Sequence, residues 1–138
     1  ANSIARPEYM ARYRVADLFL DTHPYNAGTT ASDALRMGLP MLTLKGESYQ
    51  ARMGASIVNA LNLPELITNT PEEYEALAIE LATNPKKLKS IKDKLAKNLS
   101  TAPLYNTKLF TKNLESAFTQ MYERHHGGLE PDHIYVEQ

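Results

Sequence analysis

LFLDTHPYNAGTTASDALRMGLP, residues 18–40, joins a strand-like apolar run to a helix through a loop that ends in Gly-Thr-Thr. A helix that begins there points backbone N–H groups without intrahelical partners, and the positive end of its dipole, at whatever lies above it. We therefore expect Gly28, Thr29 and Thr30 to bind the diphosphate of a nucleotide. Asp33 lies one turn further along, within reach of the sugar hydroxyls of that nucleotide.

A purely local interpretation of the same residues is also open. Thr30 fits the N-cap of the helix, and Asp33, three residues later, fits the acidic partner of a capping box. Gly28 then supplies only a turn. The two interpretations of Asp33 are compatible, because one carboxylate oxygen can accept from the backbone while the other accepts from a ribose hydroxyl.

Strand and helix patterns alternate on both sides of this stretch. Gly38 is placed to end its helix, expected over residues 30–37. Continuous apolar runs of strand length are typical of parallel sheets covered on both faces. We predict strands at 16–20, 41–44 and 64–68, and further helices at 7–14 and 49–61. The alternation predicts an α/β fold with a partial parallel sheet, since three strands are few for a complete Rossmann-like lobe.

The second half of the chain is expected to be helical. Thr70, followed by Pro71 and then by Glu73, is a strong helix start, and Asn84-Pro85 opens the next helix. A last helix is predicted from Thr107 to near Gly127-Gly128, packing through apolar side chains at its spacing: Leu109, Phe110, Leu114, Phe118 and Met121. We expect residues 1–128 to form the folded part and residues 129–138 a tail.

Composition narrows the function classes. The 138 residues carry 15 basic and 16 acidic side chains, so net charge gives no argument for a nucleic acid or an anionic membrane as partner. The chain has no cysteine, which excludes disulfides and fits a cytoplasmic location. No apolar run approaches the roughly 18 residues that a membrane span needs. The partner must therefore be inferred from the candidate site itself.

We call the expected diphosphate-binding residues Gly28, Thr29 and Thr30 the phosphate loop. The residues around it resemble a known family of enzymes. ADLFLDTHPYNAGTTASDALRMGLPMLTLKGESYQARMGAS, at 16–56, is similar to the protein O-linked N-acetylglucosamine transferase and SPINDLY family, glycosyltransferase family 41. The likeness continues through three later segments in the same order: LNLPELIT at 61–68, APLYNTKLFTKNLESAFTQMY at 102–122 and PDHI at 131–134.

This resemblance implies a fold and an activity. The chain would be the later half of the donor lobe of a GT-B fold, followed by C-terminal helices. The enzyme would be intracellular, inverting and independent of metal and cofactor, transferring N-acetylglucosamine from its UDP donor to Ser or Thr of an acceptor protein. The catalytic residues, tetratricopeptide repeats and acceptor lobe would precede Ala1, so the fragment alone should be inactive.

The family also suggests a base-binding set near the N-terminus. Arg6, Tyr9 and Arg12 stand where related enzymes place residues around the nucleobase. Tyr9 and Gly28 both replace a histidine of the animal enzymes. Three alternatives stay open: the same fold with GDP-fucose, the same fold with UDP-glucose, or a non-catalytic interaction module with a decayed site.

The resemblance places the first strands of this lobe before Ala1, so one strand of the fragment would lack its usual neighbour. Either the strand at 16–20 or the strand at 41–44 would normally pair with them. An apolar edge left with unpaired N–H and C=O groups tends to pair with another chain. We therefore expect a homodimer of the fragment through an exposed sheet edge.

Overall fold

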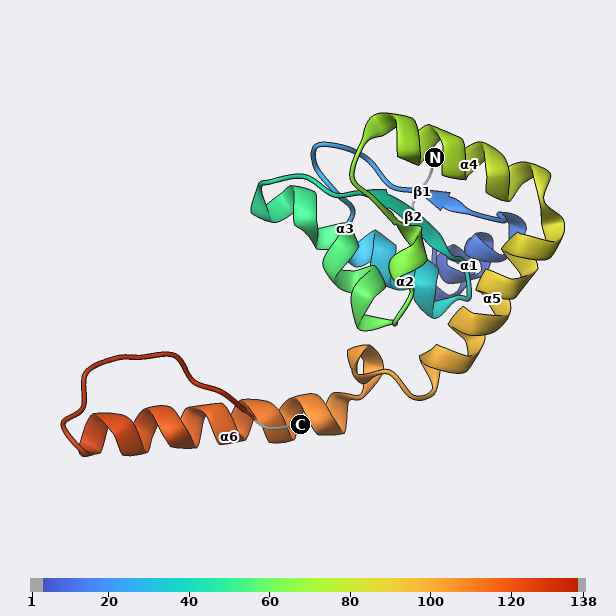
Figure 1. Ribbon diagram of the computed structural model, residues 1–138. Coiled ribbons are helices and arrows are strands. Elements are labelled where there is room, and N and C mark those ends of the chain that lie inside the picture. The colour runs from blue at the N-terminus through green and yellow to red at the C-terminus, as the bar shows by residue number, and fades with distance from the viewer. Residues whose placement is uncertain (1–3, 137–138) are drawn as a thin grey trace. The chain divides into compact units, whose positions relative to one another are not determined.

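The computed structural model describes residues 4–136, and it separates into two compact units (Figure 1). The first ends at Ala102 and the second begins at Pro103. The first unit contains the sheet and the predicted nucleotide site. The second contains a short 3-10 turn, η3 (Pro103–Tyr105), and the long helix α6 (Thr107–His126).

A parallel sheet of three strands lies at the centre of the first unit. The strands are β1 (Phe19–Leu20), β2 (Met41–Leu44) and β3 (Ile67–Thr68), in the spatial order β1-β2-β3. Phe19 pairs with Met41, and Thr43 pairs with Ile67. All four residues of β2 are buried, as its continuous apolar run indicates. The predicted α/β fold class, with a partial parallel sheet followed by helices, is confirmed.

The strand β1 is shorter than the predicted 16–20. Only Phe19 and Leu20 pair with β2, and Leu20 is 54% exposed. The apolar run predicted a strand buried on both faces, but β1 lies at the edge of the sheet among the described residues. Since β2 has a strand on each side, it is not the exposed edge, and that alternative is wrong. Self-association through β1 stays a prediction.

Helices lie on both sides of this sheet. Figure 1 shows α2 (Thr29–Arg36) and α3 (Tyr49–Ala60) on one side and α4 (Pro71–Thr83) on the other, with α5 (Pro85–Leu99) after it. Gly38 follows α2 at φ +83°, the left-handed conformation that glycine adopts most easily. Large side chains that are fully buried form the core: Leu35, Met41, Leu42, Val58, Leu61, Leu63, Leu66, Leu81 and Leu95.

The start of α4 shows why the local sequence signals succeed. Thr70 Oγ1 accepts a hydrogen bond from the backbone N–H of Glu73 at 3.2 Å, as the predicted capping box requires. The Glu73 carboxylate accepts from the N–H of Asn69 at 2.8 Å, one residue before the cap. The strand predicted at 64–68 is shorter in the structure. Its first three residues form the 3-10 turn η2 (Pro64–Leu66), and only Ile67 and Thr68 belong to β3.

The helix α6 of the second unit has no buried residue in the part of the chain that is described. Four of the five apolar side chains expected to pack are exposed, from 40% at Leu114 to 66% at Phe110, and the fifth, Leu109, is half-buried. After α6 the chain turns back, and the N–H of Leu129 donates to the carbonyl of Arg124 at 3.1 Å. Residues 137–138 of the predicted tail lie outside the described residues. Among residues 4–136, no helix combines the length and the apolar character that crossing a membrane requires.

Candidate nucleotide-binding site

The predicted site lies where the parallel strands end. The loop 21–28 leads from β1 into α2, and the loop 45–48 leads from β2 into α3. Because both strands run in the same direction, both loops leave the sheet at the same edge. The carboxyl edge of a parallel sheet is where ligands of open α/β folds bind.

The start of α2 leaves the predicted phosphate-binding residues accessible. Gly28 is the N-cap, with φ −105° and ψ −85°, and no side chain caps this helix. Thr29 and Thr30 form its first two positions and are exposed. The alternative with Thr30 as N-cap is therefore wrong, because the helix begins one residue earlier. An uncapped helix start with two exposed hydroxyls presents hydrogen-bond donors and a positive dipole end to an anion.

Asp33 forms an ion pair in place of the expected capping box. Arg6 Nη2 donates to Asp33 Oδ1 at 2.9 Å. The side chain of Asp33 is 10% exposed and that of Arg6 is 68% exposed, so the carboxylate is buried beneath an accessible guanidinium. The contact joins a predicted ribose-binding residue to a predicted base-binding residue.

Arg6 belongs to the first helical segment, which consists of α1 (Arg6–Ala11) and the 3-10 turn η1 (Arg12–Val15). Tyr9, on α1, has its hydroxyl oxygen 2.6 Å from that of Tyr13, and the two rings meet edge to face at 5.5 Å. Tyr13 Oη in turn donates to the backbone carbonyl of Thr30 at 3.4 Å. The first helical segment therefore contacts the start of α2 at two points.

Tyr13 is a residue of this site that the sequence reasoning missed. Its position four residues after Tyr9 was a usable signal, since side chains at that spacing share a helix face. Burial raises the pKa of the Tyr13 phenol, and the hydrogen bond to Tyr9 and the charge of Asp33 raise it further, against a lowering by Arg6. Tyr13 therefore stays a neutral hydrogen-bond donor.

Arg12 stands apart from these contacts. It begins η1 with an exposed side chain, and the hydrogen bonds of the cluster join Arg6 to Asp33 and Tyr9 to Tyr13 without it. A base-binding role for Arg12 stays a prediction that rests on the family resemblance.

A small cavity adjoins the phosphate loop. It has a volume of about 190 Å³ and is lined by Tyr49, Arg52, Met53 and Ser56 of α3. A Cβ placed on Gly28 would meet Met53 Cγ at 3.9 Å, an ordinary van der Waals distance. Gly28 thus lies near a residue that lines this cavity, and a Cβ at position 28 would meet no close contact.

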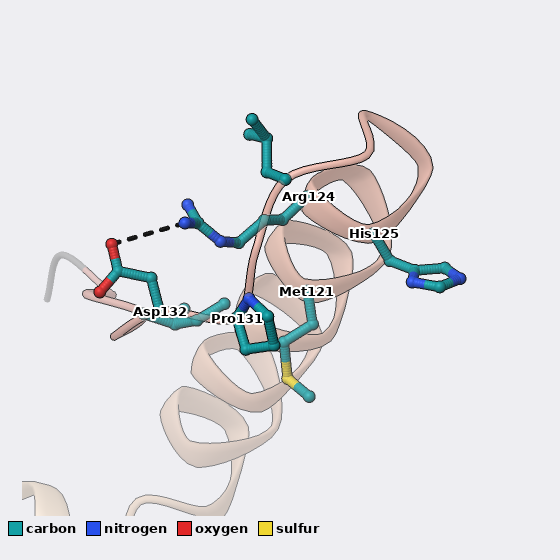
Figure 2. Close-up of a pocket in the computed structure, with 7 residues that line it drawn as sticks. Met121, Arg124, His125, Pro131 and Asp132 are labelled. Atoms are coloured by element: carbon teal, nitrogen blue, oxygen red, sulfur yellow. Dashed lines mark ion pairs between the residues drawn. The ribbon is translucent and has the colours of Figure 1, made fainter.

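A second cavity lies within the C-terminal unit (Figure 2). It measures about 380 Å³ and is lined by Met121, Arg124, His125, Leu129, Pro131, Asp132 and Ile134. Its charged groups are paired, with Arg124 Nη2 3.5 Å from Asp132 Oδ2. None of the predicted site residues lines it. Across residues 4–136, the structure places no three His, Cys, Asp or Glu side chains together as a metal site would need.

Comparison with known proteins yields a family match and several relatives. The model of glycosyl transferase family 41 matches residues 1–114. A probable UDP-N-acetylglucosamine–peptide N-acetylglucosaminyltransferase SEC of Arabidopsis thaliana is 37% identical over 95% of this chain and 14% of its own length. The UDP-N-acetylglucosamine–peptide N-acetylglucosaminyltransferase of Caenorhabditis elegans is 34% identical over 97% of this chain and 12% of its own length.

A solved structure agrees with these sequence matches. The K341M mutant of the Thermobaculum terrenum O-GlcNAc transferase superimposes with a TM-score of 0.81 at 32% identity. The match covers 88% of this chain and 24% of that protein. This chain therefore spans only a small part of the proteins it matches.

Proposed function

The chain belongs to glycosyl transferase family 41, and from that premise we propose that it forms the donor-binding part of a protein O-glycosyltransferase. The donor is UDP-N-acetylglucosamine and the acceptor is a Ser or Thr hydroxyl of another protein. The names of the Arabidopsis and Caenorhabditis relatives, which contain both this donor and a peptide acceptor, support this choice.

The contact between Arg6 and Asp33 is the main support for this proposal. The 2.9 Å ion pair between Arg6 and Asp33 brings the first helical segment against α2. A nucleotide bound across this junction would have its diphosphate at Gly28, Thr29 and Thr30. Its ribose would lie at Asp33 and its base near Tyr9, whose aromatic face can stack on a base.

The chemistry required of this part is charge stabilisation. In the transfer, the bond between the anomeric carbon of the sugar and the β-phosphate oxygen breaks as the acceptor oxygen bonds to that carbon. The acceptor hydroxyl gives up its proton to a general base or to water, and negative charge grows on the UDP that leaves. The uncapped start of α2 offers donors to that charge, and such stabilisation is among the largest contributions to catalysis. The transfer is proposed to be inverting and to need no cofactor or metal.

The same arrangement would accept a related donor. Nothing in the Arg6–Asp33 contact distinguishes uracil from guanine, so GDP-fucose and UDP-glucose are the alternatives within the fold. A ligand panel on the full-length protein separates them: melting temperature measured with UDP, GDP, UDP-N-acetylglucosamine, UDP-glucose and GDP-fucose. Binding to the folded state raises the melting temperature. We expect UDP and UDP-N-acetylglucosamine to give the largest increases.

The variant Thr30→Ala tests whether the ligands bind at the start of α2. Each ligand should raise its melting temperature by less than it raises that of the unmodified protein. The melting temperature without ligand should stay the same. A larger response to GDP and GDP-fucose would reassign the donor. No response to any nucleotide would contradict the proposal and favour a non-catalytic interaction module.

A further inference from the structure

The loop that precedes the phosphate-binding residues is organised around a buried carboxylate. Asp21 follows β1 directly and is 6% exposed. Its Oδ1 accepts two backbone hydrogen bonds, from the N–H of Thr22 at 2.9 Å and from the N–H of Ala27 at 2.8 Å. The side chain thus joins the first and last parts of the loop 22–27, and the next residue is Gly28, the N-cap of α2.

The second carboxylate oxygen ties this loop to the sheet. Asp21 Oδ2 accepts from the hydroxyl of Thr43, on β2, at 2.7 Å. Thr43 is fully buried. A hydrogen bond to an ionised group is stronger than one between neutral groups. The loop position is therefore fixed relative to the central strand and not only to β1.

A glycine of α3 leaves the space that this arrangement needs. A Cβ on Gly54 would lie 2.3 Å from Thr43 Oγ1 and 2.4 Å from Asp21 Oδ2, far inside contact distance. The N–H of Gly54 also lies 3.3 Å from Oδ1 of Asn26, a buried residue of the same loop. The backbone of α3 at Gly54 therefore packs directly against the hydrogen-bonded side chains of Asp21 and Thr43.

We propose that Asp21 is a positioning residue for the diphosphate site, acting through the loop 22–27 to hold Gly28, Thr29 and Thr30 in their binding conformation. The proposal rests on the function proposed above. The carboxylate contacts no ligand itself. By fixing both ends of the loop before the donor arrives, it removes the ordering cost that a flexible loop would add to binding.

The test uses the full-length protein and three probes: UDP, inorganic diphosphate and uridine. Thr43→Val removes one hydrogen bond from the Asp21 carboxylate with little change in shape. We expect UDP and inorganic diphosphate to bind about two- to ten-fold more weakly, as fits one lost hydrogen bond, and uridine affinity to stay the same. Asp21→Ala should act in the same direction and more strongly.

Asp21→Asn separates geometry from charge. Because both backbone N–H groups donate to Oδ1, an amide oxygen there keeps them, and the amide nitrogen can donate to Thr43 Oγ1. We expect near-normal affinity for inorganic diphosphate in this variant. Tyr74→Phe is the matched control, because Tyr74 Oη donates at 2.9 Å to the backbone carbonyl of Asp21 and not to its carboxylate.

Two results would overturn the proposal. One is unchanged diphosphate affinity in Thr43→Val while Thr30→Ala loses it, which would leave the proposed function intact. The other is an equal loss for uridine and diphosphate together with a lower melting temperature, which would mean a general loss of structure. Failure of the unmodified protein to bind either UDP or diphosphate would overturn the proposed function as well.

Discussion

Arg6 and Asp33 are 27 residues apart in the chain, and Arg6 Nη2 lies 2.9 Å from Asp33 Oδ1. The family resemblance places Arg6 at the base and Asp33 at the ribose, so the structure joins two predicted contacts of one nucleoside. Since the carboxylate is buried and the guanidinium is accessible, Arg6 orients Asp33 from the solvent side.

From this pair we predict that Arg6 supports donor binding through Asp33, even without a direct contact to the base. We expect Arg6→Met to weaken UDP binding about ten-fold, the cost of an unpaired buried charge next to the ribose. Arg6→Lys should recover part of the loss, because it restores the charge. Titration calorimetry on the full-length protein measures both variants. Arg14→Met, an exposed arginine of the same helical segment, is the control, and equal losses in both would refute a specific role for Arg6.

Asp33 is expected to recognise the ribose hydroxyls. Asp33→Asn should lower the affinity for UDP about ten- to a hundred-fold, as expected for the loss of a hydrogen bond to a charged group. The 2′,3′-dideoxy analogue of UDP lacks those hydroxyls, so its affinity should be low in the unmodified protein and change little with the substitution. Thr30→Ala should weaken both ligands alike. If Asp33→Asn weakened both alike as well, Asp33 would not bind the ribose.

Tyr13 should make stability depend on pH in the alkaline range. Its pKa in the folded state is raised above the usual value near 10, chiefly by burial. Above pH 10 the unfolded chain releases this proton while the folded chain keeps it. The contribution to stability is therefore complete below pH 10 and is lost as the pH rises.

Denaturant unfolding between pH 8 and 11 measures this effect. The unmodified protein should lose more unfolding free energy over the range than Tyr13→Phe. Tyr74, whose pKa is also raised, is present in both proteins and cancels in the comparison. Parallel pH curves for the two proteins would show that Tyr13 does not titrate differently on folding.

The sequence predicted those parts of the fold in which neighbouring residues determine the outcome. The cap at Thr70, the turn at Gly38 and the buried run of β2 depend on local spacing, and the structure has all three. The extent of β1 depends on whether another strand lies beside it, which an apolar run does not encode. Five residues were predicted as strand and two pair.

The same division holds for the candidate site. The glycine and threonines at the start of α2 were recognisable because the loop and the helix start are contiguous. The Arg6–Asp33 pair and the contact of Tyr13 with Thr30 depend on how the first helical segment packs against α2. Asp21 was hidden for another reason. A polar residue in a loop suggests exposure, and only the tertiary structure shows that this carboxylate is buried and bonded on both oxygens.

Arg12 gives a test that contrasts with Asp21. If it contacts the base, Arg12→Ala should weaken UDP and uridine but leave inorganic diphosphate unchanged. The loss should be about three- to thirty-fold, the usual range for one polar contact. Thr43→Val should show the opposite selectivity among the same probes. Equal losses of UDP and diphosphate in Arg12→Ala would move this residue to the phosphate end of the site.

Gly54 provides the strictest test of the packing behind the phosphate loop. Gly54→Ala would place a methyl group 2.4 Å from Asp21 Oδ2 and 2.3 Å from Thr43 Oγ1, so either α3 or the loop must shift. Overpacking of this kind costs about 1–3 kcal/mol, and breaking the Asp21–Thr43 bond adds to that. We expect a clear loss of unfolding free energy in denaturant titration, with weaker diphosphate binding in the fraction that folds.

Gly28→Ala is the matched control, because the nearest atom to its Cβ would be Met53 Cγ at 3.9 Å. The stability of this variant should stay close to that of the unmodified protein. A Gly54→Ala protein as stable as Gly28→Ala would mean that α3 moves away at little cost, and the loop would then not be fixed by this contact.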